Sequence, residues 1–123
     1  WICHSADADA GLLKVWEDIG AKLVNVPVAQ GRQLDVAAGL RALGAEGVTR
    51  VFCEGGGAFA ASLLAADVVD SLIGFSAGVA LGAEGQPAIG ALGVERLSLA
   101  TRFQLLSTQK VGADAMQIWT RRR

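Results

Sequence analysis

The residues of this chain whose types and spacing suggest chemistry lie in one short stretch, Glu54-Gly55-Gly56-Gly57. Residues 48–53 before it are rich in β-branched and aromatic side chains and predict a strand. Residues 58–66 after it are good helix formers and predict a short helix. Glycines at such a junction let a ligand approach the main chain, and the free N–H groups of the first helical turn favour an anion. The pattern therefore predicts a loop that binds a phosphate or pyrophosphate.

The glycine loop matches neither of the two common phosphate-binding motifs. It is not GxGxxG, and no Lys-Ser/Thr pair follows it as in a Walker loop. The alternative is a tight turn whose glycines only permit close packing of the helix. Glu54 lies at the carboxyl end of the predicted strand, where open α/β sheets place their ligands, and it is suited to accept hydrogen bonds from hydroxyl or amino groups. A salt-bridged surface acid or a helix N-cap is the alternative role for this residue.

The elements that must position this loop alternate along the chain. Asp35 is a good N-cap, residues 36–43 place apolar side chains on one helical face, and Gly44 supplies a stop. Near the end, Gly112-Ala113-Asp114 supplies a turn between two partly alternating runs, which predicts an antiparallel hairpin. The expected order has strands at 1–4, 23–28, 48–53 and 69–80, helices at 14–21, 36–43 and 58–66, a loop at 81–93, and a hairpin at 96–107 and 115–121. This order predicts an α/β fold in one domain, with a mostly parallel sheet, flanking helices and a C-terminal antiparallel hairpin.

Composition excludes several classes of function. A net charge of −1 provides no basic field for nucleic acid or an anionic membrane. The one basic run, at residues 121–123, is interpreted as a solvated terminal cluster. No apolar stretch approaches the ~20 residues of a membrane span. His4 stands alone, so no metal site is expected, and Cys3 and Cys53 are interpreted as small buried hydrophobic residues of a reducing, cytoplasmic compartment.

Several ordered motifs resemble the riboflavin-specific deaminase–reductase family. Residues 51–64, VFCEGGGAFAASLL, are similar to its VEGGGxLAxSLL signature. Residues 67–72 resemble its GLVDEL segment, and residues 80–85 its LLGGDG segment, although Ala83 replaces a glycine. Residues 31–36 and 110–114 resemble its GRLDL and VGxD segments. The resemblance covers essentially the whole chain and favours the C-terminal reductase domain of the bacterial bifunctional type.

The resemblance implies a dihydrofolate-reductase-like fold and a specific reaction. That reaction is the NADPH-dependent reduction of 5-amino-6-(5-phosphoribosylamino)uracil to the ribityl compound, with hydride passing to the sugar C1′. By motif position, Glu54 resembles the family's substrate-contacting glutamate. The implied cofactor-binding stretch comprises Gly56, Gly57, Ala58, Phe59, Ala60, Ala61 and Ser62. No catalytic acid–base pair is evident, which suits a reaction in which the cofactor supplies the chemistry and the protein positions two ligands.

The resemblance also predicts what surrounds this chain. The family's "SLDG"-type segment, its substrate-phosphate residues and its N-terminal zinc deaminase domain are not found here, so we expect the N-terminal part of the reductase domain to be missing and the 123 residues alone to have little activity. A homo-oligomer, such as a dimer, is expected to cover the exposed apolar surface. Another dihydrofolate-reductase-like reductase with a different heterocyclic substrate, or a non-catalytic nucleotide-binding or oligomerisation module, remain alternatives. Preference for NADPH over NADH rests on the resemblance alone, because no arginine adjoins the loop.

Overall fold

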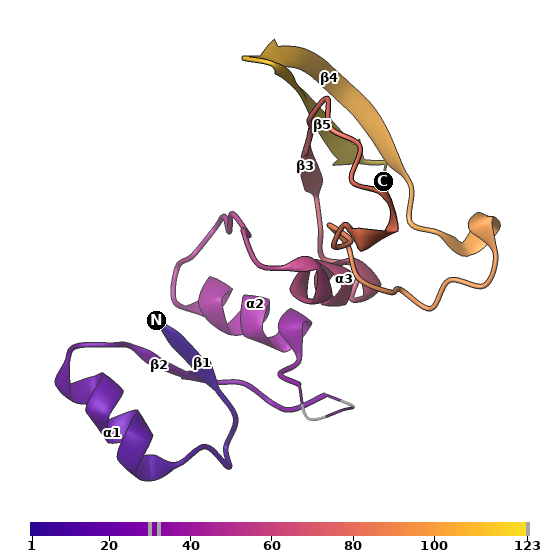
Figure 1. Ribbon diagram of the computed structural model, residues 1–123. Helices are drawn as coiled ribbons and strands as arrows, with labels where there is room; N and C mark the ends of the chain where they lie inside the picture. Colours follow the sequence, from indigo (N-terminus) through magenta and orange to yellow (C-terminus); the bar gives the residue numbers. More distant parts are fainter. Residues whose placement is uncertain (30, 32, 123) are drawn as a thin grey trace. The chain divides into compact units, whose positions relative to one another are not determined.

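The computed structural model describes all residues except 30, 32 and 123, and they form two compact units. The first unit comprises Trp1–Cys53 and the second comprises Glu54–Arg123. Each unit has its own sheet and is described by itself (Figure 1). The sequence Gly31-Arg32-Gln33 also predicts a turn, and Arg32 of this turn lies outside the described residues.

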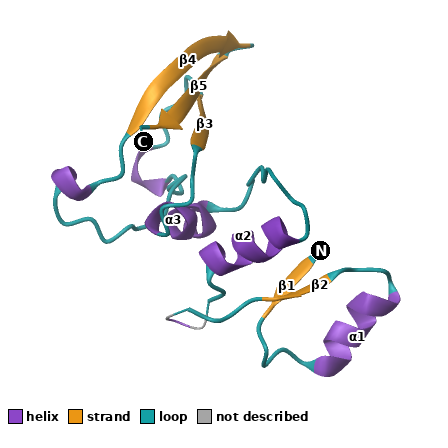
Figure 2. Cartoon of the chain, turned by 180° about the vertical axis from the view of Figure 1, so that it is seen from behind, coloured by secondary structure: helices purple, strands orange, loops and turns teal. Residues whose placement is uncertain are grey.

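The first unit begins with two parallel strands joined by a helix. Strand β1, Ile2–His4, pairs in parallel with β2, Leu23–Asn25, and helix α1, Ala10–Asp18, lies between them in the sequence. Parallel neighbours need such a crossover, because a tight turn can only reverse the chain. Helix α1 connects the two strands (Figure 2). The side chain of Asp9 caps α1 by accepting a hydrogen bond from the N–H of Leu12 at 2.9 Å. The predicted strand–helix–strand order is therefore confirmed here.

Helix α2, Val36–Ala45, follows the sequence prediction closely at its start. Asp35 is its N-cap, and the carboxylate accepts a hydrogen bond from the N–H of Ala38 at 2.9 Å. The helix does not end at Gly44 as expected, but continues to Ala45. The chain reverses instead at Gly47, whose φ of +90° is a conformation that favours glycine.

The small core of the first unit lies around β2. Val26 is 1% exposed, and Val24 is also buried. Gly39 of α2 faces Val26 closely, since a Cβ at position 39 would lie 3.7 Å from Val26 Cγ1. The helix packs on this strand through a residue without a side chain.

The strand predicted at residues 48–53 is wrong. These residues form no strand, and Val51 and Phe52 are 54% and 74% exposed. The expectation that Cys3 and Cys53 are buried is also wrong, because both are free and exposed. The β propensity of a segment reflects how well it fits a half-buried pleated surface, so an apolar run without a hydrogen-bonded neighbour stays irregular.

The second unit consists of one helix and a three-stranded sheet. Helix α3, Gly57–Ala65, precedes strand β3, Ser71–Ser76, and short 3₁₀ turns follow at Gly82–Glu84 and Leu97–Leu99. Strands β4, Phe103–Val111, and β5, Asp114–Arg121, form the predicted antiparallel hairpin. Gly112 in its turn has a φ of +63°, a backbone conformation that favours glycine over residues with a side chain.

The α/β fold class is confirmed, but the sheets differ from the single, mostly parallel sheet that the sequence predicts. Parallel pairing is found between β1 and β2, whereas the second sheet has the order β3-β5-β4 and is antiparallel throughout. Leu72 and Leu105 lie opposite Trp119 on the central strand β5. The core residues of this unit lie on α3, where Ala61, Leu63 and Leu64 are buried. No helix in the described part of the chain is long and apolar enough to cross a bilayer.

Candidate cofactor-binding site

The start of helix α3 presents backbone donors without partners. Gly56 is the N-cap, with φ of −65° and ψ of 172°, and its carbonyl accepts hydrogen bonds from the N–H groups of Phe59 and Ala60, both at 3.0 Å. The N–H groups of Gly57 and Ala58 donate to no acceptor among the described residues. Two N–H groups at the positive end of the helix dipole can therefore bind an anion.

A second segment of the same unit packs against this helix start. The N–H of Gly90 donates to the carbonyl of Gly57 at 2.8 Å. A Cβ at position 57 would lie 2.6 Å from the carbonyl oxygen of Pro87, and one at position 90 would lie 3.2 Å from the carbonyl oxygen of Gly57. Position 57 thus needs glycine, and a side chain at position 90 would be tightly packed against the Gly57 carbonyl. Residues 81–93, predicted from the sequence to be a loop, therefore pack part of their backbone against the start of α3.

The rest of the glycine loop is open on one side and closed on the other. A Cβ at Gly56 would meet no heavy atom within 4 Å, so a ligand can approach the main chain there. A Cβ at Gly55 would lie 2.7 Å from Cδ1 of Phe59, whose side chain is half-exposed and covers that side of the loop. The main chain at Gly56 is thus accessible, and phosphate binding by this loop stays a prediction.

Glu54 stands at the beginning of the second unit with an exposed side chain. Within the described part of the chain its carboxylate forms neither an ion pair nor a hydrogen bond, so the salt-bridge alternative is not seen. The N-cap alternative is wrong, because Gly56 occupies that position. The carboxylate is therefore available to accept hydrogen bonds from a bound molecule, and its substrate role stays a prediction.

The other predicted cofactor-binding residues lie further along α3. Ala61 is 7% exposed, so it can contribute to a ligand site only through its backbone. The hydroxyl of Ser62 donates to the carbonyl of Ala58 at 3.1 Å, one turn into the helix. The structure thus places residues 56–58 at the open end of the helix and the hydroxyl of Ser62 away from it. Among the described residues, no group of three or more His, Cys, Asp or Glu side chains could hold a metal ion.

Comparison with protein-family models gives one match that spans most of the chain. Residues 4–117 match the family described as the RibD C-terminal domain. Comparison with curated proteins gives no significant match.

Solved structures show the same fold in reductase-like proteins. The chain is similar to RibD of Acinetobacter baumannii in two crystal forms, each with a TM-score of 0.67 and 16% identity over 89% of this chain. It is also similar to a pyrimidine reductase-like protein of Corynebacterium diphtheriae, with a TM-score of 0.76 and 17% identity over 98% of this chain. The matched region is 29% of the length of the RibD chain and 49% of the length of the pyrimidine reductase-like protein. At this identity the likeness establishes the fold, in agreement with the fold that the motif resemblance implied.

Proposed function

The chain belongs to the RibD C-terminal domain family, and from that premise we propose that it takes part in the NADPH-dependent reduction of 5-amino-6-(5-phosphoribosylamino)uracil to its ribityl form. The family match supports a reductase of the riboflavin pathway. The observation that carries the finer proposal is the pair of unpartnered N–H groups of Gly57 and Ala58 at the start of α3. They follow Gly56, where a Cβ would meet no heavy atom within 4 Å, so we infer that a dinucleotide phosphate approaches the main chain from that side.

Each residue of the site has a distinct role in this proposal. The N–H groups of Gly57 and Ala58 hold a phosphate of NADPH, and the open space at Gly56 admits it. The hydrogen bond between Gly90 and Gly57 keeps the loop in the binding conformation before the cofactor arrives. NADPH, when bound, supplies the hydride. The carboxylate of Glu54 accepts hydrogen bonds from the hydroxyl or amino groups of the phosphoribosylaminopyrimidine and so orients the sugar carbon.

A titration that follows the two ligands separately tests these roles. NADPH binding is measured by its fluorescence, and pyrimidine binding by calorimetry on the whole parent protein. Glu54→Gln should leave the affinity for NADPH unchanged and weaken pyrimidine binding by on the order of tenfold, since a hydrogen bond to a charged group is lost. Loss of NADPH affinity in this variant, or unchanged pyrimidine affinity, would remove Glu54 from its proposed role. Absence of NADPH binding by the unmodified protein would refute the function itself.

A second candidate function, self-association, is favoured by one face of the second sheet. Ile73 and Phe75 of β3 are 45% and 63% exposed, and they lie opposite Ile118 and Met116 of β5. Alternate residues of a strand share a face, so these four side chains form one apolar patch. We propose that this patch contributes to a homo-oligomer. Sedimentation velocity should show a shift toward monomer for Phe75→Gln but not for Gln109→Ala, a polar neighbour on the same face; identical profiles would exclude the patch.

The whole protein is proposed to be larger than the reductase domain. RibD of Acinetobacter baumannii is more than three times as long as the region that this chain matches. We propose that the domain is joined in the parent protein to an N-terminal deaminase domain and acts in the cytoplasm. The sequence upstream of residue 1 checks this directly, because a zinc-binding His/Cys pattern would have to be present there.

A further inference from the structure

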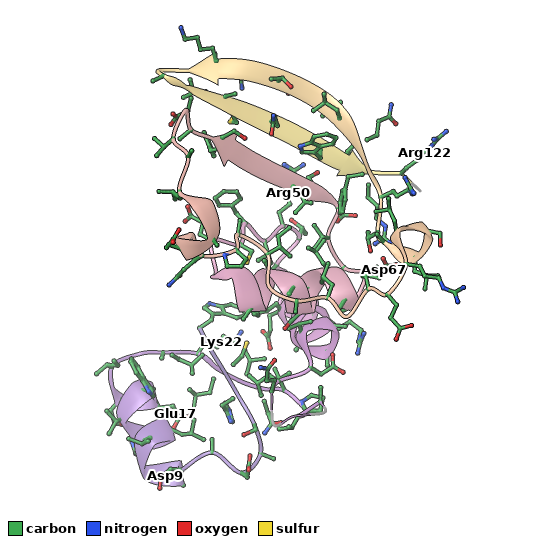
Figure 3. All side chains as sticks on the ribbon, turned by 45° about the vertical axis from the view of Figure 1, so that its right-hand side comes forward. Asp9, Glu17, Lys22, Arg50, Asp67 and Arg122 are labelled. Carbon is green, nitrogen blue, oxygen red and sulfur yellow. The ribbon has the colours of Figure 1, made fainter. Side chains whose placement is uncertain are left out.

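A cavity lined by arginines lies at the end of the second unit that is remote from the glycine loop. Its volume is about 310 Å³. Asp67, just after α3, and Arg122, just after β5, lie on the same side of the second unit in Figure 3. The residues that line the cavity are Asp67, Ser98, Ala100, Thr101, Arg102, Arg121 and Arg122. Helix α3 has nine residues, so its two ends are roughly 13 Å apart, and this cavity is separate from the candidate cofactor site.

One arginine of the cavity is held firmly in place. The side chain of Arg121 is 21% exposed, and its guanidinium donates to the carbonyl of Asp67 at 2.6 Å and also to the Asp67 carboxylate. The N–H of Arg121 donates in turn to the carbonyl of Asp70 at 2.8 Å. A guanidinium has several N–H groups, so Arg121 keeps donors for a further acceptor after these bonds are made.

The other two arginines, Arg102 and Arg122, add positive charge to the lining of the cavity. The ion pairs of the described residues join Arg121 with Asp67, Lys14 with Asp18 and Lys22 with Glu46, and none includes Arg102 or Arg122. Three guanidiniums and one carboxylate leave two positive charges around the cavity. The hydroxyls of Ser98 and Thr101 line the same space and can donate to an oxygen anion.

We propose that this cavity binds a phosphate dianion, either free or as the phosphate of a small phosphoester. The lining holds three guanidiniums and one carboxylate, an excess of positive charge that suits a phosphate dianion, and its guanidinium groups and hydroxyls match the oxygen acceptors of phosphate. Arg121 is fixed by Asp67 and presents its remaining N–H groups without losing side-chain freedom on binding. A volume of about 310 Å³ has room for a phosphate with an attached sugar. The net charge of −1 argues against nucleic acid as the occupant.

Nuclear magnetic resonance of the 123-residue chain tests the proposal with defined probes. Inorganic phosphate and ribose 5-phosphate are titrated in parallel, and the backbone N–H signals of residues 98–102 and 120–122 are followed. Saturable shifts of these residues are expected, and the probe that binds more tightly shows whether the free ion or the ester is the preferred form. Signals of Gly57 and Ala58 report the cofactor site independently, so failure of one proposal is distinguishable from failure of the other.

Two matched variants decide whether the arginines are responsible. The double variant Arg102→Gln with Arg122→Gln should weaken phosphate binding by on the order of tenfold or more, because charge-assisted hydrogen bonds are lost. Arg41 is an exposed arginine of α2 that does not line the cavity. Arg41→Gln also removes one positive charge, but it should leave phosphate binding unchanged. Equal weakening in both, or shifts that grow without saturation, would overturn the proposal. Tighter binding of a short single-stranded oligonucleotide than of ribose 5-phosphate would overturn it as well.

Discussion

The N–H of Gly90 lies 2.8 Å from the carbonyl oxygen of Gly57, so a loop that follows β3 is hydrogen-bonded to the first turn of α3. The two residues are 33 positions apart in the sequence, yet the backbones approach closely: a Cβ at position 57 would lie 2.6 Å from the carbonyl oxygen of Pro87, and one at position 90 would lie 3.2 Å from that of Gly57. A tertiary contact therefore fixes the conformation of the glycine loop, and the lack of side chains on its glycines permits that contact. Preorganisation of this kind lowers the cost of ordering the loop when an anion binds.

The close approach at Gly57 predicts the effect of a single methyl group. Gly57→Ala would place a Cβ 2.6 Å from the carbonyl oxygen of Pro87, and backbone cannot move as a flexible side chain does. We expect a loss of about 1–3 kcal/mol in the free energy of unfolding, measured by urea denaturation, together with weaker NADPH binding.

A glycine with free space around it supplies the control for this measurement. Gly44 lies inside α2, and a Cβ there would meet nothing within 4 Å. Gly44→Ala should stabilise the chain by roughly 0.5–1 kcal/mol, because alanine loses less backbone entropy in a helix. A comparable loss of stability in both variants would show that the contact with Pro87 is not the cause.

The bonds between Arg121 and Asp67 predict unequal effects for the two partners. Arg121→Gln removes the hydrogen bond to the Asp67 carbonyl and the ion pair, and should cost about 1–2 kcal/mol of unfolding free energy. Asp67→Gly removes only the ion pair of an exposed carboxylate, worth about 0–1 kcal/mol, and also relieves the strain of a φ of +63°. That variant should be nearly neutral. Trp119 fluorescence follows the transition, with Trp1 and Trp16 replaced by Phe; equal destabilisation would contradict this account.

The N-cap of α2 predicts a local effect in the first unit. Asp35→Ala removes the acceptor for the Ala38 N–H and should lower the free energy of unfolding by about 1 kcal/mol. Asp35→Ser should restore most of the loss, because serine is also a good N-cap. Hydrogen exchange at the start of α2 measures the effect directly, and unchanged protection in the alanine variant would refute it.

A further prediction is that the 123 residues bind NADPH but do not catalyse its oxidation. The 123 residues alone are expected to bind NADPH through the N–H groups of Gly57 and Ala58, but to show little or no NADPH oxidation when the pyrimidine is added. The reason is that Glu54 is the one substrate-contacting residue that the motifs assign to this chain. Absorbance at the NADPH band follows the reaction, and the whole parent protein provides the positive control. Clear turnover by the 123 residues would contradict the prediction.

The sequence by itself determined the elements that depend on interactions between residues close together in the chain. The cap at Asp35, the helix after the glycines and the turn at Gly112 form where the sequence predicts them, because capping bonds, helix propensity and turn conformation act within a few residues. The first strand of the hairpin, predicted at 96–107, lies instead at 103–111. The position of the glycine loop could also be read from the sequence, because three consecutive glycines have no side chains to cover the backbone.

Only the tertiary structure decided which segments pair and which side chains meet. Residues 48–53 have strand composition but form no strand, and β3 runs antiparallel to β5, because pairing depends on distant partners that propensity does not encode. The terminal arginines, interpreted from sequence as solvated, include two that line a cavity with Arg102. The glycine loop itself is supported by Gly90, a contact that no local pattern could have revealed, because it requires the chain to return to the start of α3 after a whole strand.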